Sequence, residues 1–166
     1  MTLDDSAFDF RNGCTLAIVF QTQLIDTSLG LLQLGTSIAT QYFHVTRDGA
    51  TAQARIRTSH GGTDEDIFAS GMLVADTPTI LSVRYGPGAY DEVVPAYVYK
   101  NGDVSNTGSL NVLGSRTYDE NRLCDNGDVS DDFNGVVAEF VLLGRQMTTG
   151  EHTELIDHLK DKYGIS

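Results

Sequence analysis

The chain has 166 residues, the size of one ordinary domain, and its composition of 40% hydrophobic and 20% charged residues can build a buried core. Eleven basic residues against 23 acidic ones give a formal net charge of −12, which repels phosphate backbones and anionic membrane surfaces. We therefore expect a single domain over residues 1–166 that has no nucleic-acid partner.

The sequence also predicts no membrane insertion and no signal peptide. No apolar run approaches the roughly 18 residues of a membrane-spanning helix, and the acidic first ten residues lack the apolar segment of a signal peptide. Cys14 and Cys124 share no CxxC spacing. The default expectation is two reduced thiols, and a disulfide between facing strands is the alternative.

Most of the chain is predicted to form short strands. Residues 14–22 are β-branched and aromatic on both faces, which is typical of a central strand. Residues 52–58 alternate strictly between apolar and polar side chains, and Asn101-Gly102 predicts a tight hairpin turn. Residues 135–144 are apolar at nearly every position, which predicts a strand buried on both sides. The other predicted strands cover residues 29–35, 41–49, 79–85, 94–100 and 109–114.

One helix is predicted, near the C-terminal end of the sequence. Thr148 and Glu151 have the spacing of a capping box, and Gly164 is placed to end the helix. Between them lies an apolar stripe formed by Leu155, Ile156 and Leu159. Many short strands followed by one late helix predict an antiparallel β-sandwich.

The last third of the chain carries a family resemblance. The matching residues are Gly135, Ala138 and Glu139 in a strand, Thr148 and Glu151 in a helix cap, and Lys162, Tyr163 and Gly164 at the helix end. In this pattern the chain resembles laminin-G-like domains of the phage or bacterial type, in the concanavalin A-like lectin/glucanase superfamily. The resemblance implies a jelly roll of two antiparallel sheets with the helix packed across one side. The Trp that is usual in this family's central strand is absent, which argues against aromatic stacking on a ligand.

Catalysis is not expected. The glucanases of this superfamily use paired carboxylates on one strand face, and the nearest counterpart is Asp64, Glu65 and Asp66. A second glutamate at the right offset is missing, so we interpret residues 64–66 as a solvated loop and predict that the protein is not an enzyme. Glu139 stands alone on its strand and is expected to anchor loops or the helix.

Two loop regions are candidates for binding. A sugar site needs an aromatic ring beside planar polar acceptors, and two groups of loop residues offer both. The candidate glycan-binding residues are Tyr90, Asp91, Tyr118, Asp119 and Asn121. The alternative is that these tyrosines are exposed and bind nothing.

An aspartate-rich segment raises the question of calcium. Its carboxylates could supply hard oxygen ligands, and the resemblance implies one loop-bound calcium ion, although the spacing is not that of an EF-hand. The candidate ligands are Asp125, Asp128, Asp131 and Asp132. The alternative is an ordinary polar hairpin.

Two functions fit a jelly roll without a catalytic array. The first is a structural surface module of a phage virion, as a decoration or tail/fibre component docked on the capsid or tail, with glycan binding at its loop edge. The alternative is a stand-alone, lectin-like carbohydrate-binding module, with or without calcium, located in the cytoplasm or exported without a leader. We expect the virion surface as the location in the first case.

Overall fold

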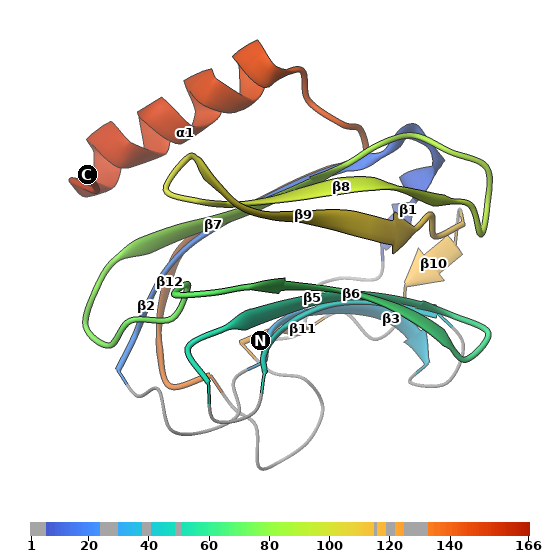
Figure 1. Cartoon of the computed structure of the whole chain (residues 1–166), viewed down its shortest axis with the longest axis horizontal. Helices are drawn as coiled ribbons and strands as arrows, with labels where there is room; N and C mark the ends of the chain where they lie inside the picture. Colours follow the sequence, from blue (N-terminus) through green and yellow to red (C-terminus); the bar gives the residue numbers. More distant parts are fainter. Residues whose placement is uncertain are drawn as a thin grey trace.

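The chain folds into two five-stranded antiparallel sheets with one helix on the outside of one sheet (Figure 1). This computed structural model describes residues 6–23, 30–37, 41–48, 51–114, 116–118, 122–124 and 133–166. The predicted all-β sandwich with one C-terminal helix is confirmed. Within the described residues, no helix is both long enough and apolar enough to cross a bilayer.

The helix covers the outer face of only one of the two sheets, and the sheets are named accordingly. The first, called the β4 sheet, has the strand order β11-β3-β4-β5-β6, and the second, called the helix-covered sheet, has the order β12-β2-β7-β8-β9. The β4 sheet contains β3 (Gly30–Ser37), β4 (Gln41–Arg47), β5 (Ala54–His60), β6 (Thr63–Ala69) and β11 (Arg122–Leu123). The helix-covered sheet contains β2 (Cys14–Thr22), β7 (Thr79–Tyr85), β8 (Val93–Lys100), β9 (Asp103–Asn111) and β12 (Gly135–Leu143). The remaining elements are β1 (Ser6–Phe8), which pairs with β10 (Arg116–Tyr118), the 3-10 turn η1 (Phe10–Asn12) and α1 (Thr149–Tyr163).

The main core lies between the two sheets and follows the alternation along the strands. Phe43 and Val45 on β4, and Ala54 and Ile56 on β5, are fully buried in it. The residues between them therefore point to the outer face of the β4 sheet. Strand β2 lies between β12 and β7 and is buried along nearly its whole length, as predicted for a central strand.

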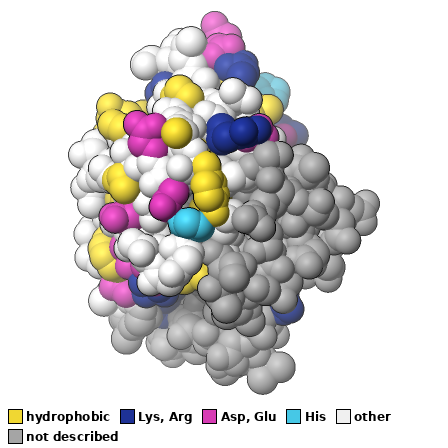
Figure 2. Space-filling view, turned by 90° about the vertical axis from the view of Figure 1, so that its right-hand side faces the viewer, with side chains coloured by type: hydrophobic (Ala, Val, Ile, Leu, Met, Phe, Trp, Pro, Cys, Tyr) yellow, Lys and Arg dark blue, Asp and Glu magenta, His cyan; other side chains and the backbone are white. Residues whose placement is uncertain are grey.

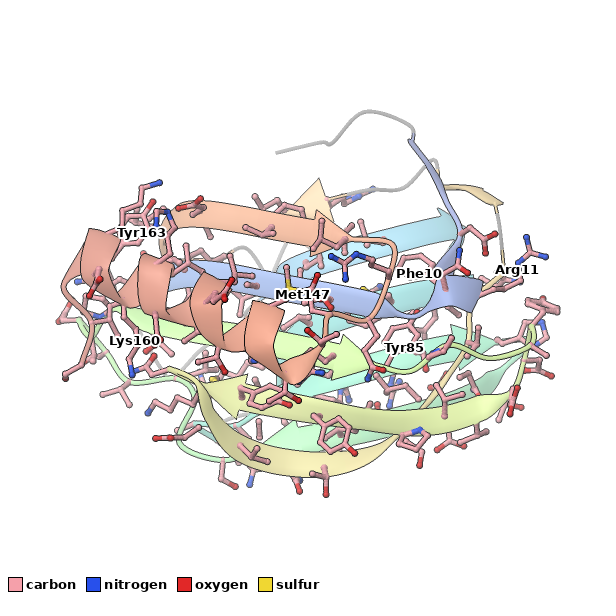
Figure 3. The ribbon with its side chains drawn as sticks, turned by 90° about the horizontal axis from the view of Figure 1, so that it is seen from above. Phe10, Arg11, Tyr85, Met147, Lys160 and Tyr163 are labelled. Atoms are coloured by element: carbon pink, nitrogen blue, oxygen red, sulfur yellow. The ribbon has the colours of Figure 1, made fainter. Side chains whose placement is uncertain are left out.

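Helix α1 is fixed at both ends by the predicted residues. The Thr148 side chain accepts a hydrogen bond from the Glu151 N–H, the Glu151 carboxylate accepts one from the Thr148 N–H, and Gly164 ends the helix in the left-handed conformation. Ile156 and Leu159 are buried in a second cluster between α1 and the sheet. Seen from above, α1 lies across the outer face of the helix-covered sheet (Figure 3).

The far end of α1 is tied to β12. Glu139 on β12 accepts hydrogen bonds from Lys162 Nζ and from the Tyr163 hydroxyl, both at 2.9 Å, and Figure 3 shows Tyr163 at this end of the helix. These two bonds, with Lys162 the stronger cause, lower the pKa of Glu139. The expectation that Glu139 anchors the helix is confirmed.

Two local expectations are wrong. Asp64, Glu65 and Asp66 lie on a strand, β6, and not in a solvated loop. Strand β12, expected to be buried on both sides, is an edge strand that is only half-buried and leaves Val136 exposed. The turn at Asn101-Gly102 is confirmed, but β9 begins directly after it, six residues before the predicted strand 109–114.

The cysteines are both free thiols, in agreement with the default expectation. Cys14 is buried in the core, and this burial raises the pKa of its thiol. Cys124 is partly buried. Cys14 therefore acts as a small apolar core residue.

Candidate functional site

Tyr90 and Asp91 lie in the loop between β7 and β8, at one end of the sandwich. The loop is fixed by backbone bonds, since the Asp91 N–H donates to the Val112 carbonyl at 3.0 Å. Asp91 has a positive φ of 66°, which Asp tolerates better than most residues. The Tyr90 ring lies over Gly114, where an added Cβ would be 2.9 Å from a ring carbon. The ring is thus held in place while 41% of Tyr90 stays exposed.

His60 and Gln41 join this loop from the opposite sheet. They are register partners at the ends of β5 and β4. His60 Nδ1 lies 2.6 Å from Asp91 Oδ1, and His60 Nε2 lies 2.5 Å from the Tyr90 hydroxyl. Gln41 Nε2 donates a hydrogen bond to the same hydroxyl. We call these four residues the end site, and Figure 2 shows this end of the molecule, with a histidine beside acidic and apolar side chains.

The hydrogen-bond order in the end site follows from its chemistry. The Asp91 carboxylate can only accept, so His60 Nδ1 donates to it, and in the neutral imidazole Nε2 then accepts from the Tyr90 hydroxyl. That hydroxyl in turn accepts from Gln41. The carboxylate thereby fixes the histidine tautomer, and the chain of bonds connects the two sheets.

One buried atom of the end site has no partner. Gln41 is 2% exposed, and its Oε1 makes no hydrogen bond in the part of the chain that the structure describes. A buried amide oxygen without a partner is costly and rare in folded proteins. A ligand that donates a hydroxyl hydrogen at this end would satisfy it.

The predicted site residues have different outcomes. Tyr90 and Asp91 do lie together, and sequence reasoning missed His60 and Gln41, which come from strands 30 to 50 residues earlier. Tyr118 lies on β10, where its backbone pairs with Ser6. The other candidate residues lie outside the described residues: Asp119, Asn121, Asp125, Asp128, Asp131 and Asp132.

Two of the three carboxylates of β6, those of Asp64 and Asp66, are held in an ion-pair network. Arg57 Nε and Nη2 donate to the two oxygens of Asp66, each at 2.7 Å, and Arg57 Nη1 lies 2.7 Å from Asp64. The Tyr42 hydroxyl also donates to Asp64, at 3.2 Å. These contacts, led by the hydrogen bonds with Asp66, raise the pKa of Arg57. Carboxylates held in this way are cross-strand structural partners.

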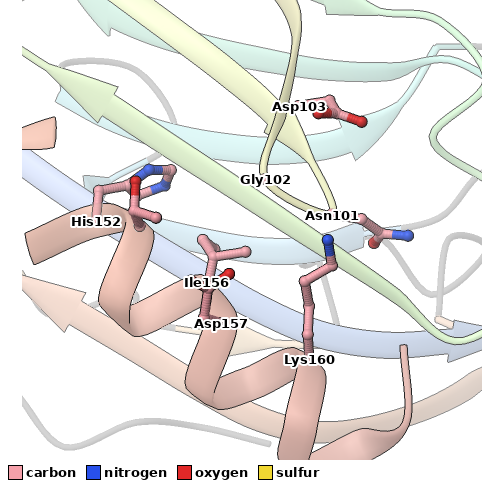
Figure 4. Close-up of a pocket in the computed structure, with 8 residues that line it drawn as sticks. Asn101, Gly102, Asp103, His152, Ile156, Asp157 and Lys160 are labelled. Carbon is pink, nitrogen blue, oxygen red and sulfur yellow. The ribbon is translucent and has the colours of Figure 1, made fainter. Parts of the chain in front are cut away.

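A hollow of about 190 Å³ lies between α1 and the β8–β9 turn (Figure 4). The turn contributes Asn101 and Gly102, and α1 contributes His152, Ile156 and Lys160. The buried His152 ring is hydrogen-bonded to the Ser82 hydroxyl at 2.9 Å. None of the unpartnered buried side-chain atoms in the described ranges belongs to a residue lining this hollow. The end site is therefore the stronger candidate.

Metal binding has no support in the described part of the chain. There, no group of three or more His, Cys, Asp or Glu side chains lies close enough together to hold an ion. The predicted calcium ligands lie outside that part, so the calcium expectation remains a prediction.

Known proteins were compared with the chain by sequence and by structure. No model of a protein family matches the sequence, and no curated protein matches it either. Solved structures do match. The Ruminococcus gnavus IT-sialidase CBM40 bound to alpha2,3 sialyllactose has a TM-score of 0.67 and 12% identity, over 94% of this chain and 95% of that one.

Two further structures support the same architecture. Domain 4 of AbnA, a GH43 extracellular arabinanase from Geobacillus stearothermophilus in complex with arabinotriose, has a TM-score of 0.64 and 14% identity, over 87% of this chain and 66% of that one. Domains LG4-5 of the mouse laminin alpha1 chain have a TM-score of 0.61 and 10% identity, over 90% and 40%. Identities this low show the fold alone. The chain has the concanavalin A-like lectin/glucanase fold, as the resemblance implied.

Proposed function

We propose that the chain is a non-catalytic carbohydrate-binding module and that the end site is its binding site. The observation that carries this proposal is the buried, unpartnered Oε1 of Gln41 beside the exposed ring of Tyr90. A sugar offers both an apolar face for the ring and hydroxyl hydrogens for the amide oxygen. The half-exposed Asp91 carboxylate can accept a second hydroxyl.

The similar structures support this class of ligand. One similar structure is described with sialyllactose bound and another with arabinotriose, so two proteins with this fold bind saccharides. Neither the sugar nor the position of its site transfers to this chain at such low identity. The chemistry of the end site therefore has to be tested by itself.

The carboxylates near the end site support a binding function over catalysis. A glycosidase needs two carboxyl groups free to act as acid and as nucleophile or base. Here Asp91 is bound to His60, and Glu92 Oε2 accepts the Ala89 N–H at 2.8 Å. Asp64 and Asp66 are paired with Arg57. Each is thus engaged in holding the fold or the loop.

A glycan array, with and without a calcium chelator, followed by calorimetry with the best saccharide, tests the proposal. We expect Tyr90→Ala to weaken binding about tenfold or more, because the loss of an aromatic platform is worth about 1.4 kcal/mol. Tyr97→Ala is the matched control, since Tyr97 is a 38% exposed tyrosine on β8. An array without a single bound glycan would refute the function, and equal binding by Tyr90→Ala would refute the location.

The virion setting remains a prediction. The similar structures support the stand-alone lectin-like alternative better than a decoration or tail/fibre component, because the described saccharide complexes concern glycan binding. Detection of the protein in purified phage particles would support a capsid or tail partner and a location on the virion surface. Its absence from the particles of a phage that encodes it would count against both.

A further inference from the structure

The outer face of the β4 sheet carries a second set of side chains, separate from the end site. Register places Thr46 on β4 opposite Arg55 on β5, and Arg55 opposite Phe68 on β6. His44 lies two residues from Thr46 along β4, on the same face. Opposed positions in a sheet have Cβ atoms about 5 Å apart, so these four side chains are neighbours.

Three of the four carry a buried polar atom without a partner. Thr46 Oγ1, His44 Nε2 and Arg55 Nε make no hydrogen bond within the described ranges, and Thr46 is only 7% exposed. Buried polar groups are nearly always hydrogen-bonded in native proteins. Three such atoms at adjacent positions indicate one missing partner for the whole group.

The neighbouring arginine shows which kind of partner is missing. Arg57 is bound by the carboxylates of Asp66 and Asp64, at 2.7 Å each. Among the residues that the structure describes, Arg55 forms no ion pair of this kind, and its Nε is unpartnered. A guanidinium matches an oxyanion best, because the oxyanion accepts two parallel N–H bonds.

We propose that this outer face binds the oxyanion group of an acidic saccharide, either a carboxylate or a sulfate ester. The Arg55 guanidinium holds the charge, and the Thr46 hydroxyl donates to a further oxygen. His44 Nε2 forms a hydrogen bond with a sugar hydroxyl. Phe68, which is 38% exposed beside Arg55, packs against the apolar side of the sugar ring.

This second site goes beyond the proposed function in place and in ligand class. Gln41 of the end site and Thr46 are five residues apart on β4, which is about 17 Å at the rise of a strand. A monosaccharide cannot reach both positions. Single sugars therefore report on each site separately, whereas a longer acidic oligosaccharide that reaches both gains from avidity.

The net charge of the chain leads to a prediction about how salt changes the affinity for an acidic sugar. The net charge of −12 opposes the approach of an anion from a distance. Salt screens that repulsion beyond about 10 Å at 0.1 M but screens a partly buried contact much less. We expect the affinity for an acidic sugar to hold or rise between about 20 and about 200 mM salt, whereas a loose ionic association would weaken.

Amide NMR titrations of the full chain with glucuronic acid, glucose 6-sulfate and glucose test the proposal. We expect at least one of the acidic sugars to shift the signals around Thr46 and Arg55 and to bind about tenfold or more tightly than glucose. Arg55→Met should abolish this binding. Arg11→Met is the matched control, because Arg11 is an arginine on η1 whose side chain is 53% exposed.

Thermal unfolding of the same variants separates binding from a structural role. Because Arg55 Nε has no partner to lose, Arg55→Met should unfold at the same temperature as the parent or higher. The proposal is overturned if neither acidic sugar binds more tightly than glucose, if Arg55→Met still binds, or if that variant unfolds at a clearly lower temperature. Shifts confined to residues 86–92 would assign the ligand to the end site and would also overturn it.

Discussion

We expect acid to destabilise the protein through two histidines, His44 on β4 and His152 on α1. The pKa of His152 is lowered from 6.5 to about 4, mainly by burial and to a smaller extent by the nearby positive charge of Arg84. The pKa of His44 is lowered to the same value, mainly by burial and to a smaller extent by the positive charges of Arg55 and Arg57. In the unfolded chain both histidines take up protons at a higher pH than in the folded protein. Stability is therefore complete above about pH 7 and falls as the pH drops toward 4.

The size of the loss follows from the two pKa values. One pKa unit corresponds to about 1.4 kcal/mol, so each histidine costs about 2 to 3 kcal/mol between pH 7.5 and pH 4.5. Together they remove about 5 kcal/mol, which is a large share of the 5–15 kcal/mol that stabilises a typical domain. Carboxylates with lowered pKa values add their own loss mainly below this range: Asp9, Asp64, Glu139 and Glu151.

Urea unfolding monitored by circular dichroism at several pH values between 7.5 and 4.5 measures this loss. His152→Gln cannot take up the proton, so its free energy of unfolding should fall about half as much as that of the parent. His158→Gln, which replaces an exposed histidine of the same helix, is the matched control for the loss of a histidine side chain. A flat free energy over this range, or an unchanged loss in His152→Gln, would refute the reasoning.

Two further predictions concern single residues. Gly135→Ala should destabilise the protein by about 2 kcal/mol or more, because the new Cβ would lie 2.2 Å from the Gln21 carbonyl oxygen, while Gly150→Ala, with nothing within 4 Å, should stabilise α1 by about 0.5 kcal/mol. Opposite shifts in thermal unfolding check this pair, and shifts of the same sign would contradict it. Thr148→Ala removes the helix cap and should cost about 1 kcal/mol, measured by urea unfolding; an unchanged midpoint would mean that the cap adds no stability.

A strand could be predicted where its own residues show a recognisable pattern of apolar and polar side chains. The first four residues of β5 alternate between apolar and polar side chains, and the ends of α1 are marked by Thr148 and Gly164. Strand β6 could not be predicted, because its acidic residues have low strand propensity and are held by Arg57 on the neighbouring strand. The apolar run of β12 does not reveal whether a strand lies at the centre or at the edge of its sheet.

Only two of the four end-site residues could be predicted, because only those two are neighbours in the sequence. Tyr90 and Asp91 stand out as an aromatic and an acidic residue between turn formers. His60 and Gln41 reach them through the register of β4 with β5 and the closure of the two sheets at one end. No spacing along the chain encodes that meeting. A histidine directly before Gly61-Gly62 marks a strand end, which was the one available signal.

The direction of β8 also determines how the protein can be attached to a surface. Its first residues adjoin the loop that holds Tyr90, and its last residues lead to Asn101, whose amide donates to the carbonyl of Ser166 at 3.4 Å. Ser166 therefore lies about 26 Å from the Tyr90 loop, the length of an eight-residue strand. A linker or sensor-chip coupling attached at Ser166 would direct the end site away from the support.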